Sequence, residues 1–200
     1  MIDEAHRQGK LIGANCYSDD SVEMCVVASF DAIEHGCLVT PRGVEAMVKR
    51  GTWMVPTLGA YNAYLAPEAE QQYLAWRLAK GRLVAEVLRE TFPKYLDMGL
   101  KVVGGSDGAG PGVGRRPGEG ALELELMVDY GMTPMQAIVA NTRLRAEVCG
   151  LLDQFGTLEE WESSNIIVVD GDLLADIKVL QKRERIQVVV KGGEVFRSDL

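Results

Sequence analysis

The sequence predicts an α/β fold in which a parallel β-sheet is followed by a smaller unit built from β-strands. Short apolar runs alternate with helical segments four times in the first two-thirds of the chain, a rhythm typical of parallel strands joined by helical crossovers. The last third changes to β-rich runs with a Gly-Gly turn before the last of them. Hydrophobic residues make up 47% and charged residues 25% of the 200-residue chain, which suits a globular protein with a substantial core.

The first half of the chain holds three predicted strands with their helices. Thr40 is a favourable N-terminal cap with Pro41 behind it, and Gly51 ends that helix. Apolar residues at helical spacing predict a long helical segment that Pro93 should kink or break before Gly99 ends it. In order, the expected elements are strand 11–15, helix 19–30, strand 31–36, helix 41–50, strand 53–58 and helical segment 67–99.

The second half holds the fourth predicted strand, two more helices and the β-rich end. Thr133 and Gln136 form a capping box around Pro134, which predicts a helix that continues to Gly150. The expected elements are strand 100–107, helix 121–130, helix 133–150 and the β-rich runs 165–172, 185–193 and 194–196.

Charge and hydropathy exclude several classes of function. The formal net charge of −8 disfavours nucleic-acid binding, and the Arg115-Arg116 pair alone does not reverse this. No segment is apolar for long enough to span a bilayer, and the polar N-terminus does not resemble a secretory signal. Four scattered cysteines without a CxxC pair favour reduced thiols. We therefore expect a cytoplasmic protein with neither a nucleic-acid nor a membrane partner.

Polar residues end each of the four predicted parallel strands. They are Asn15, Glu34 with His35, Thr57, and Ser106 with Asp107. In parallel α/β folds the ligand lies beyond the carboxyl ends of the strands, where polar side chains serve function without a burial penalty. Four polar strand ends in succession therefore predict a site at this edge of the sheet.

Six stretches that follow one another cover nearly the whole chain. They are EAHRQGKLIGANCYS, DAIEHG, WMVPTL, LKVVGGSDGAG, ELELMVDYGMTPMQAIVANTRLRAEVCGL and FGTLEEWESSNIIVVDGDLLADI. Together they resemble the C-terminal half of an amidohydrolase-superfamily protein of the imidazolonepropionase-like or prolidase-like kind. The resemblance implies a partial (β/α)₈, or TIM, barrel comprising strands five to eight within residues 1–155. It also implies that residues 156–200 form the C-terminal part of a small β-sandwich. The chain is then expected to be a truncated half of such a protein.

The resemblance implies metal-dependent hydrolysis of C–N bonds in amides, cyclic amides or peptide-like substrates. By motif, His35 matches the metal-binding histidine of strand six, and Asp107 matches the strand-eight aspartate that binds metal and acts in catalysis. The implied cofactor is a divalent metal, foremost zinc, whose bound water loses a proton near neutral pH. A carboxylate beside that water can accept the proton and pass it to the leaving nitrogen.

Two departures from the family pattern leave alternatives open. Asn15 stands where the family has its strand-five histidine, and an amide is a poor substitute for imidazole on a transition metal. The segments that supply the other family ligands are not in the sequence, so the chain alone could bind no metal and be a non-catalytic remnant or interaction module. Asn15 is then either a substrate-binding hydrogen-bonding group or a tolerated replacement. Tyr61 is either a substrate contact or a packing residue.

Three further expectations concern surfaces. Half a barrel leaves unpaired strand edges, which predicts self-association, pairing with a complementary half, or helices that cover the edges. The glycine-rich segment 108–120 lacks a phosphate-binding motif and is expected to form a mobile loop over the strand ends. The acidic residues Glu119, Glu123 and Glu125 are expected on a solvent-exposed helix face.

Overall fold

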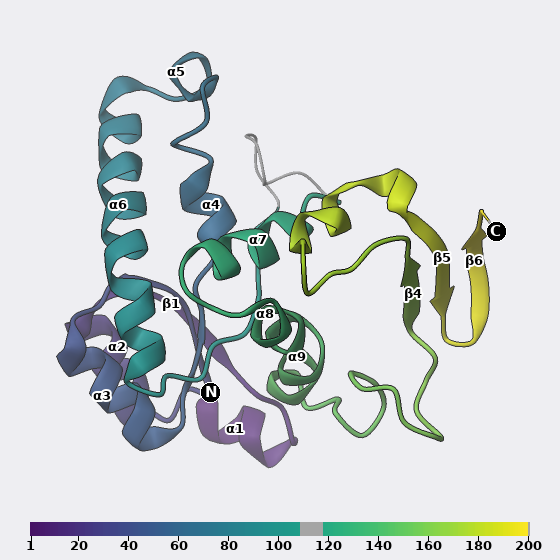
Figure 1. The fold of residues 1–200 in the computed structure, drawn as a ribbon. Helices are drawn as coiled ribbons and strands as arrows, with labels where there is room; N and C mark the ends of the chain where they lie inside the picture. The colour runs from purple at the N-terminus through teal and green to yellow at the C-terminus, as the bar shows by residue number, and fades with distance from the viewer. Residues whose placement is uncertain (109–117, 200) are drawn as a thin grey trace.

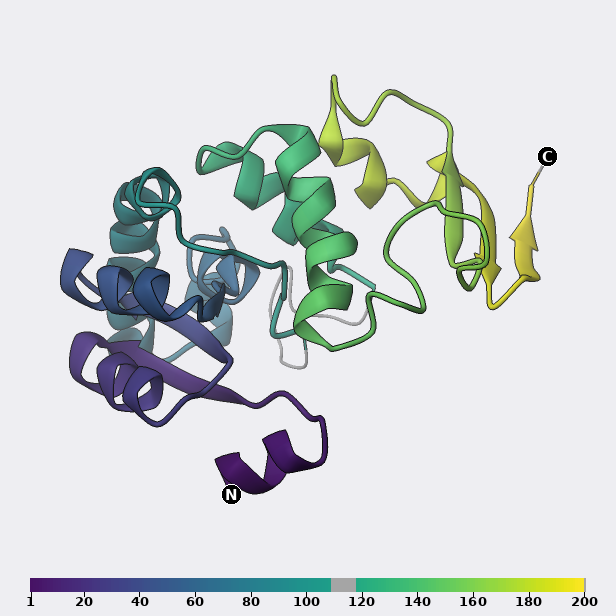
Figure 2. The same ribbon diagram turned by 90° about the horizontal axis from the view of Figure 1, so that it is seen from below.

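The computed structural model describes residues 1–108 and 118–199 as a parallel sheet with its helices and a separate antiparallel sheet. Figures 1 and 2 show the antiparallel sheet at one end of the molecule and helices α2 and α3 at the other. Helices α7, α8 and α9 lie between the two sheets in both views. The predicted mixed α/β architecture is confirmed at this level.

The parallel sheet has the order β1-β2-β3. Its strands are β1 (Gly13–Ser18), β2 (Ala32–Leu38) and β3 (Trp53–Val55), and both pairings are parallel. The expected fourth strand, 100–107, contributes one isolated parallel bridge, between Met54 and Val102. Among the described residues, β1 has a strand partner only on its β2 side, so the edge expected from the sequence is present.

Gly104 and Gly105, which follow Val103, lie very close to the side chains of Asn141 and Val55. A Cβ atom on Gly104 would lie 1.9 Å from Asn141 Oδ1, and one on Gly105 would lie 2.4 Å from Val55 Cγ1. Neither position tolerates a side chain without movement of the structure. The glycines before Asp107 therefore serve the close approach of a helix and a strand.

Helices are set by caps and packing. Gly51 ends α3 with a left-handed backbone, and the Thr133 hydroxyl accepts a hydrogen bond from Gln136 N at 3.2 Å, so the predicted capping box is confirmed. The helices are α1 (Ile2–Arg7), α2 (Asp19–Val27), α3 (Pro41–Arg50), α4 (Leu58–Asn62), α5 (Ala69–Gln72), α6 (Ala75–Asp97), α7 (Ala121–Asp129), α8 (Pro134–Asn141) and α9 (Arg143–Val148).

Helix α6 does not end at Pro93, as the sequence had suggested it could. It continues to Asp97, and the neighbouring side chains of Phe92 and Tyr95 are fully buried. This burial offsets the loss of one backbone hydrogen bond at the proline. The main core joins the sheet to α2, α3, α4, α6, α7 and α8.

The C-terminal sheet is antiparallel, with the order β4-β5-β6. Its strands are β4 (Ile166–Val169), β5 (Ile186–Lys191) and β6 (Glu194–Ser198), and two 3₁₀ helices, η1 (Ile177–Gln181) and η2 (Arg183–Arg185), precede β5. The buried side chain of Ile177 and an ion pair of 2.7 Å between Lys178 Nζ and Glu125 Oε1 attach η1 to α7. Within residues 1–108 and 118–199, no helix is both long and apolar enough to cross a membrane.

One of the three acidic residues predicted on an exposed helix face lies elsewhere. Glu123 is only 1% exposed, whereas Glu119 and Glu125 are partly accessible. The expectation that Glu123 is exposed was wrong, because its carboxylate is buried and accepts hydrogen bonds from the backbone amides of Leu58 and Gly59.

Candidate functional site

His35 is the central residue of β2 and is held on three sides. Its imidazole is 8% exposed, and its Nδ1 atom hydrogen-bonds with Thr57 Oγ1 at 2.8 Å. The Tyr17 ring stacks on it with centroids 5.0 Å apart, and the Tyr61 ring meets it edge-on at 6.1 Å. Strands β1 and β2 and helix α4 therefore fix one ring orientation for this histidine.

Asp107 follows the isolated bridge at Val102 by five residues and lies near Glu34 of β2 and Tyr17 of β1. It is exposed, and its charge raises the pKa values of two neighbouring groups. The pKa of Glu34 is raised by burial and then by Asp107, and that of Tyr17 by burial, by Cys37 and then by Asp107. The structure therefore places Asp107 near Glu34 and Tyr17, while His35 and Asn15 lie inside β2 and β1 and not at strand ends.

Three non-glycine residues of the candidate site have left-handed backbone angles. The φ values are 73° at His35, 52° at Thr57 and 48° at Asp107. Aspartate tolerates this region, but a β-branched threonine is a genuine outlier there. Such strain costs on the order of 1–3 kcal/mol per residue and persists where surrounding contacts enforce it, commonly at functional sites. Residue types alone give no sign of this strain.

The other two sequence candidates have different surroundings. Asn15 is exposed on β1, in register with Glu34 on β2. Tyr61 is partly buried in α4, and its hydroxyl accepts a hydrogen bond from Cys37 Sγ at 3.3 Å. Burial and this bond raise the Tyr61 pKa far above its ordinary value, so its hydroxyl stays neutral. Asn15 is accessible to a ligand, whereas Tyr61 packs against His35.

Sequence reasoning missed Tyr17 and Glu123. The position of Tyr17 could have been found, because side chains two residues apart on a strand share a face and Tyr17 follows Asn15 by two. The place of Glu123 could not, because its partners are the backbone amides of Leu58 and Gly59.

The described residues do not form a complete metal centre. No group of three or more histidine, cysteine, aspartate or glutamate side chains is placed to hold an ion within residues 1–108 and 118–199. A catalytic zinc site usually has three protein ligands. Imidazole and carboxylate are groups that bind zinc, but the described residues alone do not bring three such ligands together. Most of the glycine-rich segment expected as a loop over the strand ends, residues 109–117, lies outside the described residues.

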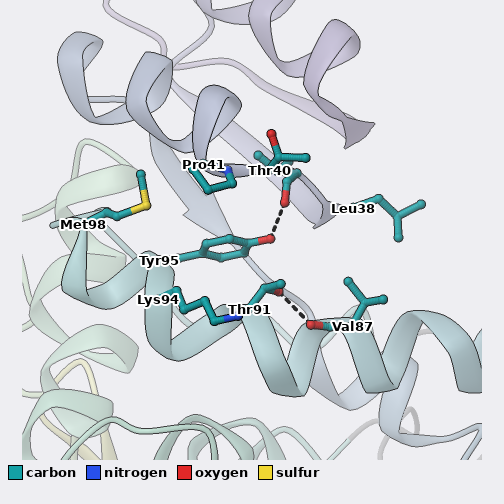
Figure 3. A pocket seen from close by; sticks show the side chains of 9 residues that line it. Leu38, Thr40, Pro41, Val87, Thr91, Lys94, Tyr95 and Met98 are labelled. Atoms are coloured by element: carbon teal, nitrogen blue, oxygen red, sulfur yellow. Dashed lines mark hydrogen bonds between the residues drawn. The ribbon is translucent and has the colours of Figure 1, made fainter.

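A cavity of about 290 Å³ lies apart from this site, between the end of β2, the start of α3 and the second half of α6 (Figure 3). Two of its hydroxyl groups are bonded within the wall, and that of Thr40 donates to Asp19 outside it. Tyr95 donates to the Val39 carbonyl at 2.5 Å, and Thr91 donates to the Val87 carbonyl at 2.8 Å. Neither His35 nor Asp107 lines this cavity, which is apolar and distinct from the candidate site.

The chain is similar to known hydrolases over nearly its whole length. Ochratoxinase of Aspergillus niger is 28% identical over 201 residues, which cover 99% of this chain and 40% of that protein. A crystal structure of a Xaa-Pro dipeptidase with methionine bound in the active site matches with a TM-score of 0.87 and 24% identity, over 98% of this chain and 47% of that one, which shows a shared fold. A prolidase complexed with N-methylphosphonate-L-proline matches with a TM-score of 0.85 and 25% identity, over 98% and 47%.

This chain therefore spans less than half the length of these relatives. The sequence profile of one family, described as the amidohydrolase family, matches residues 1–196. Since that match covers nearly all of the 200 residues, the protein belongs to the amidohydrolase family.

Proposed function

We propose that this chain supplies part of the active site of a metal-dependent hydrolase that cleaves C–N bonds of small amide, cyclic amide or peptide-like substrates. The observation that carries the proposal is that a buried, oriented His35 and an accessible Asp107 both lie beside Tyr17. Membership of the amidohydrolase family supports hydrolysis of amide bonds. The prolidase and ochratoxinase relatives support a small-molecule substrate.

In this proposal His35 and Asp107 hold a divalent metal, foremost zinc, together with donors from outside these 200 residues. Because Thr57 engages Nδ1, the ligating atom of His35 would be Nε2. Asp107 is the catalytic carboxylate, since an accessible carboxylate at this site can accept and return a proton. Asn15 and Tyr61 are the proposed substrate-side groups, with Asn15 donating or accepting a hydrogen bond.

The same proposal assigns the parallel sheet and residues 100–107 to strands five to eight of a (β/α)₈ barrel, within residues 1–155. It assigns residues 156–200 to the C-terminal part of a β-sandwich. The missing barrel strands would come from a complementary half or a second copy that pairs with the open edge of β1. The protein would act in the cytoplasm.

Zinc binding tests the partial metal site directly. The purified chain, Asn15→His and the control Asn165→His are titrated with zinc by calorimetry. Asn15→His adds an imidazole beside Glu34 at the site edge, whereas Asn165 lies ahead of β4. We expect Asn15→His to bind zinc at least about tenfold more tightly than the other two, about 1.4 kcal/mol, and His35→Gln on top of it to abolish the gain.

Equal zinc affinities of Asn15→His and Asn165→His would contradict the proposal that His35 and Asp107 are placed to bind a metal. Hydrolysis is then measured on N-acyl amino acids and X-Pro dipeptides, after mixing with the other half of a relative's barrel. Hydrolysis by this mixture, and its loss in the Asp107→Asn variant, would support the proposed hydrolase function. The specific observations that favour a non-catalytic module are Asn15 and the incomplete donor set among the described residues. Absence of both zinc binding and turnover in every mixture would establish that alternative.

A further inference from the structure

Glu123 is a buried carboxylate that the proposed chemistry does not use. It lies in α7 and is 1% exposed. Its Oε1 atom accepts a hydrogen bond from Leu58 N at 2.9 Å, and its Oε2 atom accepts one from Gly59 N at 2.8 Å. Burying a carboxylate is costly unless hydrogen bonds compensate, so this two-pronged contact needs a structural reason.

Leu58 and Gly59 are the first two residues of α4, and Thr57 is the residue before them. A threonine at this position ordinarily caps its own helix by accepting a backbone N–H. Among the described contacts Thr57 makes no such cap bond, and its hydroxyl hydrogen-bonds with His35 instead. Glu123 therefore caps α4 from another helix, and the Thr57 hydroxyl can face the histidine.

Helix α4 has only five residues and is too short to hold its own position. It nevertheless carries Tyr61, whose ring meets His35 edge-on, and it follows Thr57, whose backbone is in the left-handed region. Both contacts to the imidazole thus depend on where α4 begins. The carboxylate of Glu123 is the polar group that fixes this start from a longer, well-packed helix.

We propose that Glu123 is a positioning residue for His35: it fixes the start of α4 from α7 and thereby sets the orientation of the imidazole. Helix α7 also follows Asp107 in the chain. The Glu123 carboxylate therefore links this helix to the residues directly after Thr57, whose hydroxyl bonds with His35. The inference rests on the proposed function only for what His35 does once it is oriented. The orientation itself is measurable without metal or substrate.

The first experiment uses ring resonances of the full chain. The protein has two histidines, so His6 is an internal reference for His35 in a ¹H–¹³C spectrum recorded at one pH. We expect Glu123→Gln, whose amide can accept from only one of the two N–H groups, to shift or broaden the His35 and Tyr61 ring signals. The His6 signal should not move. Thr57→Val should shift His35 similarly, and adding Glu123→Gln to it should cause little further change.

Glu125→Gln is the matched control, because Glu125 lies on the same helix but contacts Lys178 and Gln181 of η1. It should leave the His35 signal in place. A Glu123→Gln protein that is folded, less stable and unchanged at His35 would show that Glu123 has a structural role only and would overturn the proposal. So would an equal shift in Glu125→Gln.

A second measurement covers the case in which Glu123→Gln does not fold. In the unmodified protein, the amide protons of Leu58 and Gly59 should exchange slowly, because both are bonded to a buried carboxylate. In Glu123→Asp, which keeps the charge but draws it back by one methylene, their exchange should speed up by about tenfold or more and the His35 signal should shift. Fast exchange in the unmodified protein, or an unmoved His35 signal in Glu123→Asp, would overturn the inference.

Discussion

The two sheets of this protein have three strands each, yet they differ in what holds them. In the parallel sheet, Ile33 and Met54 are fully buried in a core to which six of the described helices contribute. In the antiparallel sheet, by contrast, Ile167 is 49% exposed and Phe196 64%. The first sheet is stabilised by hydrophobic burial, while the second is attached to α7 by one buried isoleucine and a few polar contacts. The candidate site lies on the parallel sheet, where burial in the core can maintain side-chain orientation.

The largest expected difference comes from one substitution made in both sheets. Ile33→Ala should lower the free energy of unfolding by about 2–5 kcal/mol, because it opens a cavity in a closed core. Ile167→Ala in β4 should cost less than about 1 kcal/mol, since half of that side chain is already in water. Urea denaturation followed by circular dichroism measures both. Equal costs would mean that another surface covers β4, which dilution of the protein would then reveal.

The second prediction contrasts two carboxylates on one helix. Burial, opposed by the Gly59 and Leu58 amides and by Arg145, raises the pKa of Glu123 to about 7 from its ordinary 4.5. A raised pKa stabilises the fold below the ordinary value, and this stability is lost as the pH rises from 4.5 to about 7. The loss is on the order of 3 kcal/mol. Tyr130, which lies nearby, stays neutral throughout because burial raises its pKa.

Glu125 should behave in the opposite way. Burial alone would raise its pKa, but its contacts with Lys178 and Gln181 outweigh burial and lower it. Its contribution is present above the ordinary pKa and is lost on acidification below it. Stability curves from pH 3 to 8 measure both effects. Glu123→Gln should remove the decline between pH 4.5 and 7, and Glu125→Gln should leave it. A decline that survives in Glu123→Gln would assign it to another group.

Sequence reasoning succeeded where structure is set locally. The capping box at Thr133 and the left-handed glycine at Gly51 both lie where the sequence predicted them. The alternation of apolar runs and helical segments correctly predicted parallel strands joined by helices, as β1, β2 and β3 show. These features depend on neighbours in the chain or on the strand–helix alternation, and both are visible in a single sequence.

Sequence reasoning failed where distant packing decides. The residues 100–107 were expected to form a strand, but they make a single bridge, and the Gly104 N–H bonds to the Ala140 carbonyl of α8 and not to a strand. A break at Pro93 was one expectation, yet burial of its neighbours keeps α6 continuous. Glu123 could not be distinguished from an exposed glutamate, because its partners are backbone amides 65 and 64 residues away in the chain.

The third prediction concerns a single hydroxyl in the rigid half. Tyr95 donates to the Val39 carbonyl from a fully buried ring. Tyr95→Phe keeps the ring but leaves that carbonyl without its partner, so it should cost about 1–2 kcal/mol in urea denaturation. Thr91→Val is the comparison variant: its hydroxyl donates to the Val87 carbonyl of its own helix and contacts the Tyr95 hydroxyl, and its removal keeps the Tyr95–Val39 bond and should cost less. An equal cost would indicate that water replaces the Tyr95 bond in the adjoining cavity.

The smallest expected effect concerns the attachment of the antiparallel sheet. The Lys178–Glu125 pair is largely exposed on the lysine side, so Lys178→Met should hardly change global unfolding. Amide exchange within β4, β5 and β6 should nevertheless accelerate, since a loosely attached unit opens on its own before the core does. The acceleration should disappear in high salt, where the pair is already screened. If exchange rose equally in β2, the two sheets would open as one cooperative unit, and the contrast between them would be limited to their burial.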